Sequence, residues 1–124
     1  MAISERASQL ARLGEDMAVR HVETLGWQVL ERNWRCRAGE LDIIAHDPEA
    51  DVLVFVEVKC RSSERYGHPL EAITPAKEAR LWLLALAWLK ERELRCKRIR
   101  VDAIGIIVPK RGAEELVHAR GIGG

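Results

Sequence analysis

The spacing of apolar and polar positions along the chain predicts two helices. Between residues 3 and 25, apolar residues recur at close to the 3.6-residue period of an amphipathic helix, and Gly26 is expected to end it. A second helix is predicted from Pro75 to about Glu93, because Thr74 is a good N-cap and proline is favoured at the first helical position. Its apolar run at residues 81–89 predicts either a deeply buried helix or a dimer seam.

Several other stretches have the alternation or the short apolar runs of β-strands. They span residues 27–32, 40–47, 52–60 and 99–108, and residues 114–119 suit a short final strand. A polar, arginine-bearing loop is expected at residues 33–37. The resulting order, α-β-β-β-α-β, is typical of a mixed β-sheet flanked by helices. We therefore expect one α/β domain over residues 1–124.

The two central strands form a hairpin whose register follows from its loop. If residues 48–51 form a four-residue loop, pairing backwards places Asp42 opposite Glu57. Glu40 then lies opposite Lys59, and because side chains alternate along a strand these four share one face. The other face is wholly apolar, so a slip by one residue would bury acids and the pattern selects the register. That apolar face consists of Leu41, Ile43, Ala45, Val54, Val56 and Val58.

The charged end of this hairpin calls for a functional explanation. Three carboxylates and one ammonium are costly to bury unless they pair or bind a metal. Carboxylates at adjacent strand positions suit Mg²⁺, and Lys59 would orient a water molecule or balance charge on a phosphate. The alternative is a cross-strand ion network, whose pairs contribute only about 0.2–1 kcal/mol each. That network explains poorly why three acids meet one lysine, but the residues alone leave both interpretations open.

Composition and charge exclude several classes of protein. The chain is 48% hydrophobic with a net charge of +1, so it is neither disordered nor a uniformly cationic DNA coat. Its longest apolar run, residues 81–89, is far shorter than the about 20 residues of a membrane span, so we expect no membrane partner. No secretory signal pattern is visible. Cys36, Cys60 and Cys96 lack paired spacing, which argues against a disulfide scaffold or zinc site and predicts a cytoplasmic protein.

Nucleic-acid binding by a chain of this net charge requires a local patch of cations. Arginines flank the acidic strands on both sides, and a lysine lies in the first turn of the second predicted helix. We expect contacts to phosphates from Arg35, Arg37, Arg61, Arg65 and Lys77.

Five short motifs occur in order along the chain. They are Gly14-Glu15-x-x-Ala18, Arg32-Asn33-x-Arg35, Gly39-Glu40-x-Asp42-Ile43-Ile44, Val54-Phe55-Val56-Glu57-Val58-Lys59-x-Arg61 and Thr74-Pro75-x-Lys77. Together they resemble the YraN-like proteins, a bacterial family, over nearly the whole chain. The resemblance implies a restriction-endonuclease-like fold of the PD-(D/E)XK nuclease superfamily, close to archaeal-type Holliday-junction resolvases.

The resemblance also implies roles for the residues of the hairpin. Asp42 matches the metal-binding aspartate of the superfamily, and Glu57-x-Lys59 matches the (D/E)XK pair. The residue before Asp42 is Leu41, whereas the PD-(D/E)XK pattern has proline at this position. This departure is common in the resolvase branch and does not harm the chemistry.

Further roles fall on the first predicted helix. Glu15 matches an acidic metal ligand that the resolvase-like branch supplies from that helix, and Gly14 would allow the helix to approach the sheet closely. From the residues alone, Glu15 is equally a solvated acid on an amphipathic helix. Glu40 is an extra acid, expected either behind the metal ligands or paired with Lys59.

The functional expectation is a metal-dependent endonuclease that binds DNA and hydrolyses phosphodiester bonds, with branched DNA as one substrate. Asp42, Glu57 and Glu15 would bind Mg²⁺ or Mn²⁺, and Lys59 would assist the attack of water. A non-catalytic nucleic-acid-binding module and a protein-interaction adaptor with the same fold remain as alternatives. A homodimer is a further expectation, since junction resolvases act as dimers.

Overall fold

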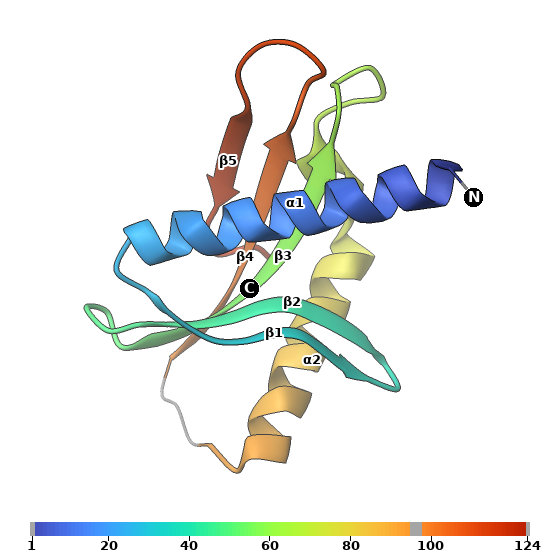
Figure 1. Ribbon diagram of the computed structural model, residues 1–124. Coiled ribbons are helices and arrows are strands. Elements are labelled where there is room, and N and C mark those ends of the chain that lie inside the picture. The colour runs from blue at the N-terminus through green and yellow to red at the C-terminus, as the bar shows by residue number, and fades with distance from the viewer. Residues whose placement is uncertain (1, 95–97, 124) are drawn as a thin grey trace.

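The computed structural model describes residues 2–94 and 98–123, with the side chains described from residue 5, and Cys96 lies outside this range. Its elements are α1 (Ala2–Thr24), β1 (Gln28–Cys36), β2 (Gly39–Asp47), β3 (Val52–Arg61), a 3-10 turn η1 (Pro69–Ala72), α2 (Pro75–Arg92), β4 (Ile99–Ile107) and β5 (Glu115–Ala119). The strands form one five-stranded sheet in the order β1-β2-β3-β4-β5 (Figure 1).

The sheet is mixed, which confirms the predicted α/β architecture. Neighbouring strands are antiparallel except β3 and β4, which are parallel and are joined through η1 and α2. A parallel pair needs a crossover connection of this kind, because a tight turn cannot return the chain to the same end of the sheet. Within the described residues, no helix is long and apolar enough to cross a membrane.

The expected loop at residues 33–37 is wrong, because β1 continues to Cys36. The extra residues pair with the start of β2 through Arg35–Glu40 and Cys36–Gly39. A polar side chain does not prevent strand pairing at the edge of a sheet, since the backbone makes the bonds while the side chain stays in water. The β1–β2 hairpin is therefore longer than predicted.

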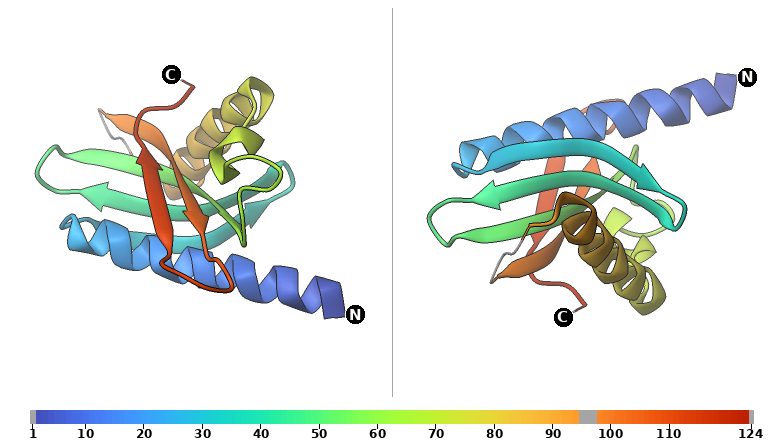
Figure 2. Two further views of the ribbon diagram at one scale, coloured as in Figure 1. Left: turned by 90° about the horizontal axis from the view of Figure 1, so that it is seen from above. Right: turned by 90° about the horizontal axis from the view of Figure 1, so that it is seen from below.

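The two helices cover opposite faces of the sheet (Figure 2). On one face, Ala18 and Val22 of α1 pack with apolar residues of β2, β3 and β4. On the other face, α2 packs over β1, β2 and β3, and Phe55 meets Trp88 edge-on with ring centroids 5.6 Å apart. The apolar run at 81–89 is buried along one side of α2, but Leu83 is 67% exposed and Leu86 is 53% exposed.

The predicted helix boundaries follow from the residues at the ends. Gly26 adopts a positive φ of 87°, two residues after α1 ends, in the left-handed region that glycine tolerates best. Thr74 caps α2 by accepting a hydrogen bond from the Lys77 N–H to its hydroxyl oxygen, at 3.2 Å, as its side chain predicts.

The position of α1 on the sheet depends on Gly14. A Cβ added at this residue would lie 2.5 Å from the Cβ and 2.8 Å from the Sγ of Cys60 in β3. These separations are shorter than any normal carbon or sulfur contact, so only glycine allows the helix to lie this close. The close approach expected of Gly14 is thereby confirmed, and it brings the next residue, Glu15, over the sheet.

Gly14→Ala is expected to destabilise the protein by about 2 kcal/mol, because the added methyl group must push α1 away from β3. In a helix that packs loosely, the same substitution stabilises by up to about 1 kcal/mol. Urea unfolding followed by circular dichroism measures the difference. Ala11→Gly, at an exposed site one turn earlier, is the control and should cost about 0.5–1 kcal/mol. A gain in stability from Gly14→Ala would contradict the contact.

Candidate functional site

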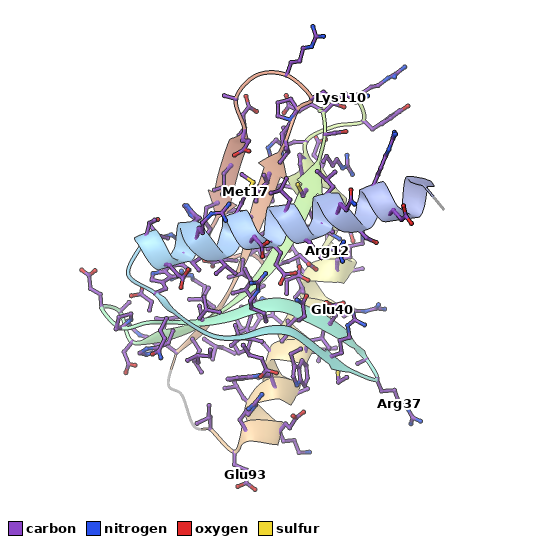
Figure 3. The ribbon with its side chains drawn as sticks, in the orientation of Figure 1. Arg12, Met17, Arg37, Glu40, Glu93 and Lys110 are labelled. Carbon is purple, nitrogen blue, oxygen red and sulfur yellow. The ribbon has the colours of Figure 1, made fainter. Side chains whose placement is uncertain are left out.

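A hollow of about 660 Å³ lies between α1 and the first three strands, and we call it the groove. Its lining residues come from α1, β1, β2 and β3 and include both acids and cations. They are Ser8, Ala11, Arg12, Glu15, Asn33, Arg35, Glu40, Asp42, Glu57, Val58 and Lys59. Figure 3 labels two of them on facing elements, Arg12 on α1 and Glu40 on β2. The structure therefore brings Glu15, Asp42, Glu57 and Lys59 together in one place.

The groove lies where β2 and β3 part. The two strands pair from Asp47–Val52 to Ile43–Val56, in the predicted register. Beyond that point, the side chain of Asp42 replaces the backbone as the partner of β3, because its Oδ2 accepts a hydrogen bond from the Val58 N–H at 2.8 Å. The strand pair thus ends at the residue that carries the predicted metal-binding carboxylate.

The predicted faces of β2 need one correction. Leu41 does not share a face with Ile43: it packs with Ile44 under α2, whereas Ile43 packs under α1. The alternation of side chains along the β1–β2 pair is interrupted at Asn33 of β1, which has a φ of 53°. Asn33 lies across from Asp42, between the Arg32–Ile43 and Trp34–Leu41 pairs. A left-handed residue rotates the backbone out of the extended path, so side chains on its two sides no longer alternate.

The carboxylate of Asp42 is held in an unfavourable environment. Its pKa is raised to about 8, first by burial and then by the adjacent carboxylate of Glu57. The N–H of Val58 and the charge of Lys59 act in the opposite direction but do not offset these effects. In the metal-free protein, the ionised form of Asp42 is therefore unfavourable at neutral pH.

Glu15 reaches the groove from α1 and is anchored by two residues of β1. Its Oε1 accepts hydrogen bonds from Arg32 Nε at 3.1 Å and from Asn33 Nδ2 at 2.8 Å. Arg32 also binds Asp16 at 2.6 Å, so one guanidinium joins two successive acids of the helix. Burial raises the pKa of Glu15, and the bonds from Arg32 oppose that shift. The sequence reasoning missed this anchoring role, although the Arg32-Asn33 pair stood among the motifs.

The structure does not show a complete ligand set for a metal. Among residues 2–94 and 98–123, no three or more histidine, cysteine, aspartate and glutamate side chains converge closely enough to hold an ion. Asp42 and Glu57 are adjacent, whereas one oxygen of Glu15 is already bonded to β1. A metal role for Glu15 stays a prediction.

The predicted phosphate-binding residues divide into two groups. Arg35 lines the groove and is 76% exposed while it pairs with Glu40 at 3.4 Å, so the ion pair of Glu40 is with Arg35 and not with Lys59. Arg37 is exposed at the end of the β1–β2 hairpin (Figure 3).

The other three predicted cations are Arg61 at the end of β3, Arg65 in the connection that follows and Lys77 in the first turn of α2. Arg61 donates to the carbonyls of Tyr66 and Gly67, and Lys77 donates to the carbonyl of Ala72. Arg65 lies over the ring of Tyr66 at 5.7 Å from its centroid. All three side chains therefore contact residues of the connection between β3 and α2. Phosphate contacts from them stay a prediction.

Comparison with known proteins identifies the family. The model of a family described as "Uncharacterised protein family UPF0102" matches residues 14–106. The chain belongs to the UPF0102 family. The family-level resemblance is thereby confirmed, and the match begins at Gly14 and includes Glu15, Asp42, Glu57 and Lys59.

Relatives match along most of the chain. A UPF0102 protein of Mycobacterium sp. (strain KMS) is 49% identical over 113 residues, which are 91% of this chain and 84% of the relative. One from Nocardioides sp. is 50% identical over 114 residues, 92% and 90% of the two chains. One from Mycolicibacterium gilvum is 41% identical over 123 residues, 99% and 100% of the two chains. The chain is therefore similar to UPF0102 proteins over nearly their full length.

Asp42→Asn is expected to raise the melting temperature of the metal-free protein. Since the pKa of Asp42 rises on folding from 3.8 to about 8, the ionised form is unfavourable in the folded state. Wild type therefore loses stability as the pH rises between these two values, and above pH 8 the full penalty is present. The amide oxygen of asparagine can still accept the Val58 N–H but the side chain does not ionise. We expect a gain of at least about 4 °C at pH 8, declining towards zero near pH 4.

The measurement is thermal unfolding in EDTA across this pH range, followed by circular dichroism. Glu49→Gln is the control, because Glu49 is an exposed carboxylate in the β2–β3 turn, and it should change the melting temperature by less than about 1 °C. A variant at Asp42 that melts at or below the wild-type temperature at pH 8 would show that the carboxylate is not held under electrostatic stress.

Proposed function

We propose that this UPF0102 protein is a metal-dependent nuclease of the restriction-endonuclease-like, PD-(D/E)XK type, which hydrolyses phosphodiester bonds in DNA. The observation that carries the proposal is the adjacent pair of carboxylates, Asp42 and Glu57, beside Lys59 in the groove where β2 and β3 part. A site that raises the pKa of an aspartate in this way favours a positively charged ligand. An ammonium group beside such a ligand suits the binding of a phosphate.

The residues fit Mg²⁺ or Mn²⁺. Mg²⁺ is commonly held by one or two carboxylates together with water and substrate phosphate, so Asp42 and Glu57 suffice as protein ligands. Glu15 would be a further ligand through the oxygen that β1 does not hold, or would act through a bound water. When bound, the ion would polarise a phosphate oxygen and lower the pKa of a water molecule.

The protein's own groups would orient the reacting atoms. Asp42 is fixed by the Val58 N–H and lies beside the carboxyl group of Glu57 in the groove wall. Lys59 is half-buried in the groove wall, where its ammonium would donate hydrogen bonds to a phosphate oxygen or to the attacking water. The water oxygen forms a bond to phosphorus, the bond to the leaving oxygen breaks, and that oxygen takes a proton.

The proposal also includes a substrate, a cellular compartment and an oligomeric state. The resemblance to Holliday-junction resolvases makes branched DNA the first substrate to test. The unpaired spacing of the cysteines makes the cytoplasm the expected compartment. A homodimer would cover the exposed leucines Leu83 and Leu86 of α2.

One observation favours a different function, a nucleic-acid-binding module that hydrolyses nothing. The carboxylates of the described residues do not form a group of three metal ligands, and Glu15 is engaged by Arg32 and Asn33. Such a module would use the same groove without binding a divalent cation. Calorimetric titration with Mn²⁺ separates the two functions, because only the nuclease requires the ion at Asp42 and Glu57.

Wild-type protein is expected to cleave branched, nicked or single-stranded DNA with Mg²⁺ or Mn²⁺ and not with EDTA. Asp42→Ala removes a metal ligand, and Lys59→Ala removes the ammonium beside the phosphate. Each substitution should lower the cleavage rate at least about 100-fold. Cleavage is measured on labelled DNA by gel electrophoresis.

Glu49→Gln, which removes a carboxylate far from the groove, is the control for net charge and should cleave at the wild-type rate. Absence of metal-dependent cleavage in wild type, or cleavage that survives both alanine substitutions, would refute the nuclease. Binding of DNA without cleavage and without heat from Mn²⁺ would instead support the binding module.

A further inference from the structure

The N-terminal end of α1 extends beyond the strands of the sheet (Figure 2). The first buried residues of the described part of the helix are Gly14 and Glu15, whereas residues 5–9 and 11–13 are exposed. We call residues 5–13 the α1 arm. It lies on the same side of the molecule as the end of the β1–β2 hairpin, in both views (Figures 1 and 2).

The arm is poorly supported by the rest of the chain. A helical segment of this length is marginal on its own in water, and most helices in proteins gain their stability from a packed face. The arm's own contribution to the surface is polar: Ser8 and Arg12 line the groove together with Glu15. The arm thus forms one wall of the candidate site, and a ligand in the groove would contact it.

The groove continues in two directions. A hollow of about 530 Å³ on the arm shares Ser8 and Arg12 with it. A hollow of about 420 Å³ along the hairpin shares Arg35 and Glu40 with it and reaches Arg37. Three neighbouring hollows with shared lining residues therefore lead from the arm, past the acids, to the end of the hairpin.

Charge varies along this path. Asp42 and Glu57 lie at its middle, while Arg12 stands on the arm and Arg35 and Arg37 on the hairpin. Arg12 and Arg37 make no ion pair with other described residues, so their guanidinium groups are available to a ligand. Three further acids line the path: Glu5 on the arm, Glu15, which is paired with Arg32, and Glu40, which is paired with Arg35.

A path with acids in the middle and guanidinium groups at both ends matches one kind of ligand. Guanidinium groups bind phosphates through paired hydrogen bonds, whereas the central carboxylates repel a phosphate unless a cation lies between them. A ligand with several phosphates in a row would therefore contact both walls and present a middle phosphate to the acids.

We propose that the α1 arm and the β1–β2 hairpin are the two walls of a nucleic-acid-binding groove, in which Arg12 contacts the DNA backbone on one side of the reacting phosphate and Arg37 on the other. The proposal rests on the proposed function, and it identifies the substrate as an internal stretch of a strand. A groove that continues on both sides of the acids does not require a strand end. Arg12 is a contact that the sequence reasoning did not include.

The test is DNA binding by fluorescence anisotropy in EDTA, which separates binding from cleavage. Wild type and Asp42→Asn serve as backgrounds, because the second keeps the side chain of residue 42 uncharged at every pH. Arg12→Gln and Arg37→Gln should each weaken binding about 5- to 10-fold and lower the slope of log affinity against log salt by about 1. The double variant should show the product of the two effects, since the residues lie on different walls.

Arg20→Gln is the matched control, because Arg20 is exposed on the same helix but does not line these hollows. It should weaken binding less than about twofold. A closed single-stranded circle should bind as tightly as a linear strand of the same length and sequence.

The possible results separate this proposal from the nuclease. Equal binding by Arg12→Gln and Arg20→Gln would overturn the arm as a wall, even if wild type cleaves DNA. Binding that requires a strand end would overturn the path through the groove. Binding that depends on Arg12 and Arg37, without metal-dependent cleavage, would support the groove and refute the nuclease. Absence of binding to any of the DNAs at low salt would overturn the groove, whereas the cleavage assay with Mg²⁺ or Mn²⁺ would still decide the nuclease.

Discussion

The candidate site depends on one hydrogen bond, in which the Asp42 side chain accepts the Val58 N–H. Where β2 and β3 part, the backbone donor of β3 would otherwise lose its partner, and an unpaired buried N–H is costly. A carboxylate satisfies that donor and also places a second oxygen at the opening between the strands. The same contact that allows the sheet to split therefore fixes the carboxyl group that the proposed chemistry would use.

Two further constraints complete this arrangement. Gly14 allows α1 to lie against Cys60 of β3, which brings Glu15 over the split. Asn33, in its left-handed conformation, interrupts the alternation of β1 and donates its side-chain amide to Glu15. Each of these residues is small or conformationally tolerant, and each occupies a position where an ordinary side chain would move the helix or the strand.

Much of the fold follows from local patterns. Alternation selects the register of the β2–β3 hairpin, because a slip would bury acids, and Thr74 marks the start of α2. The local patterns fail where backbone geometry overrides them. Nothing in the residues around Leu41 indicates that it packs under α2, since the cause lies in the backbone of Asn33 on another strand. The anchoring of Glu15 by Arg32 is likewise a long-range contact, which periodicity does not reveal.

A comparison of two aspartates separates a structural acid from a functional one. Asp102 is wholly buried, and burial alone would raise its pKa, but bonds from His118, Arg100 and the Gly121 N–H lower it instead. The pKa of Asp42 is raised instead, first by burial and then by the neighbouring carboxylate of Glu57. The protein thus has the means to neutralise a buried aspartate and does so at Asp102. At Asp42 the Val58 N–H and Lys59 compensate the charge only in part, which makes the ionised side chain unfavourable and supports the proposed binding of a cation there.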